Sequence, residues 1–248
     1  KDTEFGLIPQ DWDVVRLNDI VDIYDKQRVP LNDTERQSMK GPYPYCGANG
    51  IVDYINKYIF DGEFVLLAED GGYWGPGEKS SYVMKGKFWV NNHAHILSGI
   101  GGKVLNYYLH IVLNYQNLLP LIGGDARGKL TQAIMRQIQI PLPSIEEQRS
   151  IAYILSHIQQ AIEVQDRIIA ATKELKKALM QKLFTEGLHG EELKDAEIGK
   201  IPKSWDVKKI DEVYEFMQYG ISNQCNSDSN GVPVLRIPNI IDGIIDLT

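Results

Sequence analysis

The chain has 248 residues, of which 43% are hydrophobic and 24% charged, with a formal net charge of −7. This composition is ordinary for a globular protein, and the negative charge counts against a simple basic nucleic-acid binder, because phosphate neutralisation supplies most non-specific affinity. The sequence has no apolar run of membrane-spanning length, no N-terminal signal core, and no metal-spaced or disulfide pattern around its two distant cysteines, Cys46 and Cys225. We therefore expect a cytoplasmic protein.

The first 144 residues have the pattern of a β-rich mixed domain. A long loop-like stretch, Asp25–Gly50, comes before the first clear strand pattern. Short apolar runs bounded by Gly, Asn and Asp then predict four strands, at Ile51–Ile55, Phe64–Ala68, Ser81–Met84 and Phe88–Val90.

The second half of this domain has helical spacing. Apolar residues recur every three or four positions in Lys103–Asn117, which predicts a helix there. A short helix over Leu130–Arg136 and a strand over Gln137–Ile140 follow, and we expect Pro141 and Pro143 to end the domain.

A long helix is predicted from Ile145 to Glu186, a stretch that contains no Pro or Gly. Ser144 is a suitable N-cap, Glu147 lies three residues further on as in a capping box, and Gly187 is suited to the C-terminal cap. At about 1.5 Å per residue such a helix spans roughly 60 Å.

The predicted helix carries an apolar stripe that a small domain alone cannot bury, so another helix must lie beside it. The stripe supplies the candidate helix-pairing residues, which are Leu155, Ile158, Ile162, Ile169, Leu175, Leu179 and Leu183. Periodicity alone favours a coiled-coil dimerisation arm. A second helix of the same kind in one chain is the other possibility.

An internal repeat favours that second possibility. The opening motif Gly6-Leu7-Ile8-Pro9-Gln10-Asp11-Trp12 recurs at Gly199-Lys200-Ile201-Pro202-Lys203-Ser204-Trp205, an offset of 193 residues (199 minus 6). This period is too long for a solenoid repeat and indicates duplication of a whole unit. The predicted organisation is a domain at 1–144, a spacer helix at 145–187, and a linker with the incomplete start of a second domain at 188–248.

These motifs resemble the specificity subunits of type I restriction-modification systems. The resemblance rests on the repeated opening motif and on Leu130-Thr131, Ile138–Pro143, Glu146-Glu147-Gln148-Arg149, Ile151-Ala152 and Leu155. It implies an α+β fold in which a β-rich target-recognition domain precedes a long coiled-coil-forming helix. Here the second domain is incomplete and the second helix is absent.

The resemblance also implies a function. A subunit of this kind is not an enzyme; each of its domains reads one half of a split double-stranded DNA sequence, and its helices set the unread spacer and dock methyltransferase subunits. S-adenosylmethionine, ATP and Mg²⁺ are then expected in partner subunits and no cofactor in this chain, with a separate restriction subunit acting indirectly. The exposed stripe further predicts a homodimer through the long helix.

Candidate DNA-binding residues fall in three flexible or polar stretches. Arg commonly contacts guanine, and Asn or Gln adenine. The stretch Asp25–Gly50 offers Lys26, Arg28, Lys40, Tyr43 and Asn49; the Gly-rich run at 71–77 and its neighbour offer Tyr73, Trp74 and Lys79; and the run at 123–129 offers Arg127 and Lys129. For Trp74 the alternative is a ring that packs on its own domain.

No catalytic or metal-binding constellation is expected. The alternating pair His93 and His95 has no acidic partner nearby in the sequence, so both are interpreted as structural. Adjacent Glu69 and Asp70 are expected to point to opposite faces of a strand and to be solvated. The alternative function is a coiled-coil oligomerisation protein whose β-rich domain binds protein or sugar.

Overall fold

The structure is a computed structural model that describes residues 1–3, 5–123, 128–216, 220, 234, 235, 237, 240, 241, 244 and 245. It divides into two compact units, Lys1–Ile169 and Ala170–Thr248. Each is described by itself.

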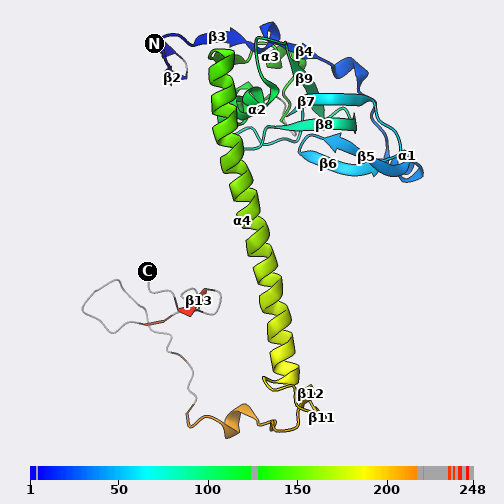
Figure 1. The fold of residues 1–248 in the computed structure, drawn as a ribbon, viewed down its shortest axis with the longest axis vertical. Helices are drawn as coiled ribbons and strands as arrows, with labels where there is room; N and C mark the ends of the chain where they lie inside the picture. Colours follow the sequence, from blue (N-terminus) through cyan, green and yellow to red (C-terminus); the bar gives the residue numbers. More distant parts are fainter. Residues whose placement is uncertain are drawn as a thin grey trace. The chain divides into compact units, whose positions relative to one another are not determined.

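The first unit is built on a six-stranded sheet with the order β4-β9-β7-β8-β5-β6 (Figure 1). Its strands are β4 (Val21–Ile23), β5 (Lys40–Gly47), β6 (Gly50–Ile55), β7 (Phe60–Ala68), β8 (Ser81–Val90) and β9 (Ala94–Gly99). Neighbouring strands are antiparallel except β5 and β8, which are parallel where Tyr45 and Cys46 lie beside Trp89 and Val90. The predicted α+β class is confirmed.

The prediction of a loop over Asp25–Gly50 is wrong. This stretch contains a 3₁₀ turn η2 (Asp25–Gln27), the helix α1 (Asp33–Ser38) and all of β5. Gly41, Pro42 and Pro44 concealed the strand, because Gly and Pro are depleted in strands, and tertiary pairing with β6 overrides that weak propensity. The strands expected at Ser81–Met84 and Phe88–Val90 are likewise one continuous strand, β8.

The helix α2 (Asn106–Tyr115) packs on β7, β8 and β9. It buries Tyr108, Leu109 and Leu113 in the larger core, which includes Leu17, Leu67 and Ile140 from other elements. The predicted helix over Lys103–Asn117 therefore exists but is shorter, because Leu105 begins it in extended conformation and Gln116 ends it.

A separate two-stranded ladder joins the beginning of the first unit to the segment at residues 139–142. Strand β3 (Asp13–Arg16) pairs antiparallel with β10 (Gln139–Leu142), which follows the short helix α3 (Gln132–Met135). Pro141 lies inside β10 opposite Val14 and does not end the domain as expected. A two-stranded ladder tolerates it because each strand has an unpaired edge.

The long helix α4 runs from Ile145 to Glu186, as predicted. Ser144 Oγ accepts the Glu147 N–H at 3.2 Å, which confirms the cap. Gly187 adopts a left-handed φ of 69°, and its N–H bonds to the Leu183 carbonyl at 3.1 Å, as in a glycine C-cap. None of the described helices is long and apolar enough to cross a membrane.

The sequence repeat is also a repeat of local structure. The hairpin β1 (Asp2–Thr3) and β2 (Gly6–Leu7) recurs in the second unit within β11 (Leu193–Ala196) and β12 (Gly199–Pro202), in the same register. The 3₁₀ turn η1 (Leu17–Asp19) recurs as η4 (Ile210–Glu212). Trp12 and Trp205 each donate their backbone N–H to the proline three residues earlier.

The two copies differ in what covers them. In the first unit the Leu17 N–H bonds to the Ile138 carbonyl, and Leu17 is fully buried. The equivalent Ile210 is 71% exposed among the described residues of the second unit. The remaining described strands there are β13 (Ile240–Ile241) and β14 (Ile244–Ile245).

Candidate nucleic-acid interface

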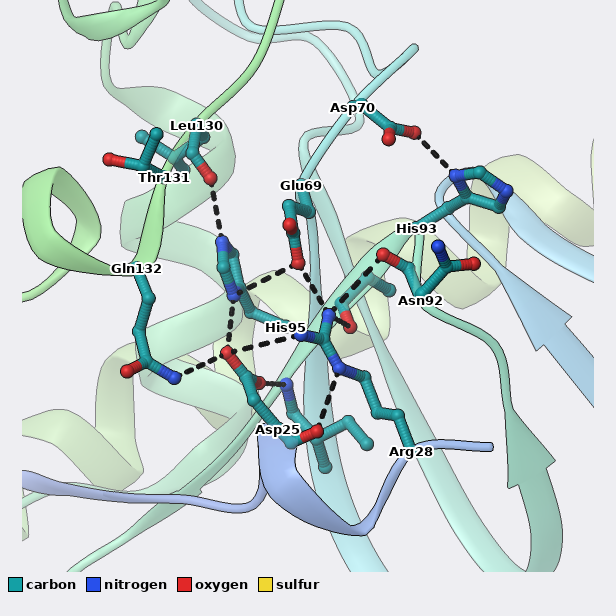
Figure 2. Close-up of polar contacts among 12 residues, drawn as sticks. Asp25, Arg28, Glu69, Asp70, Asn92, His93, His95, Leu130, Thr131 and Gln132 are labelled. Carbon is teal, nitrogen blue, oxygen red and sulfur yellow. Dashed lines mark hydrogen bonds and ion pairs between the residues drawn. The ribbon is translucent and has the colours of Figure 1, made fainter. Parts of the chain in front are cut away.

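A buried polar cluster lies beneath the carboxyl end of β7 (Figure 2). His95, on β9, is 1% exposed and reaches Asp25 of η2 with its Nδ1 (2.7 Å to Oδ2) and the Leu130 carbonyl with its Nε2 (2.7 Å). A carbonyl only accepts, so Nε2 carries a hydrogen. Asp25 Oδ2 also accepts from Gln132 Nε2 at 2.7 Å, and Oδ1 accepts from the Ile96 N–H at 2.9 Å.

Asp25 is an ionised carboxylate in this arrangement. Burial alone raises its pKa, but the hydrogen bond and charge of His95, together with the bonds from Ile96 and Gln132, lower the pKa below its usual value. Both ring nitrogens of His95 are engaged, Nδ1 with Asp25 and Nε2 with the Leu130 carbonyl. The cluster ties η2, β9 and the segment before α3 together.

Glu69, directly after β7, completes the cluster and shows that the solvated interpretation of this carboxylate is wrong. Its side chain is ion-paired with Arg28 on one oxygen and with Lys129 Nζ, at 3.0 Å, on the other. Burial raises the Glu69 pKa, whereas the bonds from Arg28 and Lys129 lower it, with a net decrease. Its partners are 41 and 60 residues distant in sequence (69 minus 28; 129 minus 69), which a strand-face argument does not detect.

One arrangement of ligand types in this cluster resembles a metal centre. Asp25, Glu69 and His95 offer ligand atoms within 4.8 Å of one another. Arg28 already bonds Glu69 and the Ala94 carbonyl (2.8 Å), and His95 Nδ1 bonds Asp25 directly at 2.7 Å. A cation would have to displace a guanidinium and break these bonds, so the cluster fits an internal salt-bridge network and not a metal site.

Above this network, several exposed polar groups gather around the carboxyl end of β7. His93 Nδ1 contacts Asp70 at 2.7 Å, and the backbones of Asp70 and Lys129 form an antiparallel β-bridge. Asn49, in the turn between β5 and β6, donates to the Gly71 carbonyl at 2.9 Å, and Tyr73 is 59% exposed. We call the surface formed by Asn49, Asp70, Tyr73, His93 and Lys129 the β7-end surface.

The structure brings five of the candidate DNA-binding residues to this region. Asn49, Tyr73 and Lys129 belong to the β7-end surface. Arg28 lies in the network beneath it with a largely buried side chain, and Lys26 is exposed in the same 3₁₀ turn as Asp25. Lys129 remains half exposed, and its hydrogen bond to Glu69 raises its pKa.

The other candidates lie elsewhere. Lys40 pairs with Asp53 at 2.6 Å and Tyr43 stacks edge-on against Tyr58, both toward the opposite end of β5 from Asn49. Lys79 is exposed and lines a groove of about 700 Å³ between α2 and residues 155–163 of α4. Arg127 lies outside the described residues.

Trp74 is 5% exposed and packs in the larger core, which favours the alternative that it stabilises its own domain. Its backbone carbonyl accepts the N–H groups of Leu118 and Leu119 at 2.9 and 3.1 Å. The run at 71–77 therefore presents Tyr73 outward while Trp74 anchors it.

The predicted helix-pairing residues are exposed along α4. Their exposed fractions range from 38% at Leu155 to 59% at Leu175, and Gln148 is the one residue of α4 that is buried. In the described part of the chain this apolar stripe is left uncovered.

Two contacts that the sequence did not reveal hold the start of α4 to the rest of the first unit. Trp12 Nε1 donates to Glu147 Oε2 at 3.0 Å. The fully buried Gln148 accepts the Leu105 N–H and donates to the Lys103 and Pro143 carbonyls. Their signal in the sequence was a polar Gln at the start of an apolar helix face, which periodicity treats as an interruption.

Comparison with known proteins gives one consistent result. The family model described as the type I restriction modification DNA specificity domain matches residues 9–174. A putative type I restriction enzyme specificity subunit of Haemophilus influenzae is 39% identical over 142 residues, covering 56% of this chain and 35% of the relative. The type I restriction enzyme MjaVIII specificity subunit of Methanocaldococcus jannaschii is 29% identical over 240 residues, covering 94% and 56%.

Solved structures share the fold. The crystal structure of a type I restriction-modification S subunit from M. genitalium matches with a TM-score of 0.57 at 16% identity, covering 70% of this chain and 46% of that one. A structure from a study of type I R-M complex assembly and conformational transition matches with a TM-score of 0.53 at 22% identity, covering 75% and 48%. The chain spans about half the length of the curated relatives it matches.

Proposed function

The chain belongs to the family of type I restriction-modification DNA specificity domains, and from that premise we propose that it reads one half of a bipartite DNA target. The recognition domain is residues 1–144, the spacer helix 145–187, and residues 188–248 begin a second recognition domain. The observation that carries the proposal is the β7-end surface. Three segments that are distant in sequence bring an amide (Asn49), a phenol (Tyr73) and an ammonium group (Lys129) to this exposed surface.

The β7-end surface offers the two kinds of contact that DNA recognition needs. Lys129 supplies charge for a phosphate, and Asn49 has an amide of the kind that reads adenine in the major groove. Arg28 and Glu69 fix the backbone beneath these groups. Binding residues are often found on loops that a scaffold of regular secondary structure holds in place.

Internal pairing explains how a chain of net charge −7 would still bind DNA. Glu69 neutralises part of the charge of Arg28 and Lys129 in the free protein. A DNA phosphate would compete with Glu69 for Lys129, which is half exposed. It would not compete for Arg28, whose guanidinium already bonds Glu69 and three backbone carbonyls. Lys129 is therefore the preferred phosphate contact, with Arg127 as its neighbour in sequence.

We further propose that α4 pairs antiparallel with an equivalent helix and docks methyltransferase subunits. In heptad notation Leu155 occupies position a, and a register centred on Arg167 places it opposite Leu179 of the other helix. The same register places Ile151 opposite Leu183 of the other helix. Both ends of such a pair are apolar, which suits a homodimer of this chain.

No chemical step is assigned to this chain. Methyl transfer would use S-adenosylmethionine held by the methyltransferase subunits, while ATP and Mg²⁺ would act in the restriction subunit, which contacts this chain indirectly. The proposed function also fits the expected cytoplasmic location, because the DNA target lies there.

The proposed function is tested by DNA retention. The methyltransferase subunits are prepared with and without this chain. Each preparation is then tested for its ability to retain duplex DNA that contains the sites modified in the host. Retention only in the presence of the chain supports the proposal. Equal retention without it would favour the alternative of an oligomerisation protein with a different ligand.

A further inference from the structure

The first turn of α4 is attached to the recognition domain by side-chain hydrogen bonds and not only by apolar packing. In a capping box the Glu147 side chain would return to the N-cap backbone. Here Glu147 Oε2 instead accepts the indole N–H of Trp12 at 3.0 Å, across 135 residues of sequence. The cap itself is kept by Ser144 Oγ.

Gln148 provides a second attachment, one residue further along the helix. Its Oε1 accepts the Leu105 N–H at 3.0 Å, and its Nε2 donates to the Lys103 carbonyl at 2.9 Å and the Pro143 carbonyl at 3.0 Å. One donor and two acceptors surround the amide, so its orientation is fixed by its partners. A fully buried polar side chain with three bonds defines one geometry far more sharply than an apolar contact does.

The two attachments act in different directions around the helix axis. Trp12 belongs to the repeated opening motif just before β3, whereas Lys103 and Leu105 precede α2. Two points on different elements restrain the tilt of the helix against the domain. We call Trp12, Glu147 and Gln148 the helix clamp.

The length of α4 makes its tilt matter. Over roughly 60 Å of helix, a tilt of about 3° at the first turn displaces the far end by about 3 Å. One base pair of B-DNA rises by about 3.4 Å. An error of a few degrees at the clamp therefore equals one base pair of separation between two half-sites.

We infer that the helix clamp is a spacer-setting device: Trp12, Glu147 and Gln148 are positioning residues that hold the recognition domain at one angle on α4 and thereby fix the number of unread base pairs. The inference rests on the proposed function. It extends that function by naming the residues that select one spacer length.

The test compares spacer lengths of sites modified by the assembled complex on random-sequence DNA. Trp12→Phe keeps the ring but removes the donor, and Glu147→Ala removes the acceptor. Both variants should modify sites whose spacers differ by one base pair from the wild-type spacer, with unchanged base preference inside each half-site. Glu147→Gln keeps an acceptor and should restore the single spacer.

Glu146→Ala is the matched control, because Glu146 lies in the same turn and is exposed. Thermal unfolding of each variant separates loss of positioning from loss of fold. A single unchanged spacer in folded Trp12→Phe and Glu147→Ala complexes would overturn the inference. The inference would also be overturned if Glu146→Ala broadened the range of spacer lengths as much as Trp12→Phe and Glu147→Ala do.

A second measurement tests the clamp without DNA or partner subunits. Spin labels are attached to cysteines that replace Lys57 and Asp166, both of which are exposed, in a chain that carries Cys225→Ser. The labels report the distribution of distances between the domain and α4 in the isolated chain. An excess of unlabelled chain suppresses distances between two labelled chains. The distribution should broaden in Trp12→Phe and Glu147→Ala and stay narrow in Glu146→Ala. An unchanged width contradicts the clamp, whereas a complex that modifies no specific sequence contradicts the proposed function.

Discussion

The imidazole of His95 and the carboxylate of Asp25 form a buried polar contact, with 2.7 Å between Nδ1 and Oδ2. The two residues are separated by 70 positions in the chain and join η2 to β9. The Leu130 carbonyl on the far side of the ring brings in the segment that leads to Lys129. The β7-end surface is thus supported by a network of largely buried side chains.

Removing the Asp25 carboxylate should destabilise the first unit. Asp25→Asn weakens the buried bonds that this carboxylate accepts from His95, Ile96 and Gln132 and removes its ion pair with Arg28, and loss of one partner of a buried pair costs about 3–5 kcal/mol. Urea unfolding followed by tryptophan fluorescence measures the change. Asp22→Asn is the control, because that carboxylate is exposed on β4, and it should change the free energy of unfolding by less than about 0.5 kcal/mol.

The same carboxylates should make stability depend on acid pH. Folding lowers the pKa of Asp25 from 3.8 and of Glu69 from 4.5, so the unfolded chain binds protons more readily. Their contribution is complete above these values and is lost as the pH falls through and below them. Urea unfolding at a series of pH values from 6 to about 3 should show this decline, and the decline should be shallower in Asp25→Asn. A parallel decline in both proteins would remove Asp25 from the explanation.

Replacing Lys129 of the β7-end surface together with Arg127, two residues earlier in the sequence, should weaken DNA binding and reduce its salt dependence. Each lost phosphate contact lowers the slope of log K against log salt by about 0.9. The double variant Arg127→Ala and Lys129→Ala in the assembled complex should therefore lose up to about 1.8 of slope. Lys57→Ala, an exposed lysine on the same domain, serves as control, and an unchanged slope in the double variant would place DNA elsewhere.

Self-association should depend on the apolar stripe of α4. Ile162→Glu puts a charge into the proposed helix pair and should shift the chain to monomer in light scattering at high concentration. Val164→Glu is the matched control, because Val164 is exposed on α4 but outside the stripe. A wild-type chain that is already monomeric, or an equal effect of both variants, would contradict pairing through this face.

Local signals in the sequence predicted the long helix and the repeated unit better than they predicted the residues of the β7-end surface and the network beneath it. The limits of α4 follow from a capping serine, a terminal glycine and the absence of Pro and Gly between them. The repeated opening motif recurs as the same hairpin register because it is a local structure. Both depend on residues close together in the chain.

The polar network could not be predicted in this way. Asp25, Glu69 and His95 meet only because β7 and β9 are neighbours and η2 packs beside them. Glu69 lies next to Asp70 in the sequence, and this pair of carboxylates predicts a solvated side chain. Its ion pair with Arg28 is visible only in the folded structure. The strand β5 was missed for a related reason, since pairing with β6 overrides the prolines in its sequence.

We propose that this chain selects the DNA sequence on which partner subunits act. The most direct test is a map of modified bases in DNA from cells that express the methyltransferase subunits with the wild-type chain, with Asn49→Ala and Tyr73→Ala, or without the chain. We expect one bipartite motif with the wild-type chain, altered base preference confined to one half of it with the variants, and no motif without the chain. The same motif in all three cases would contradict it.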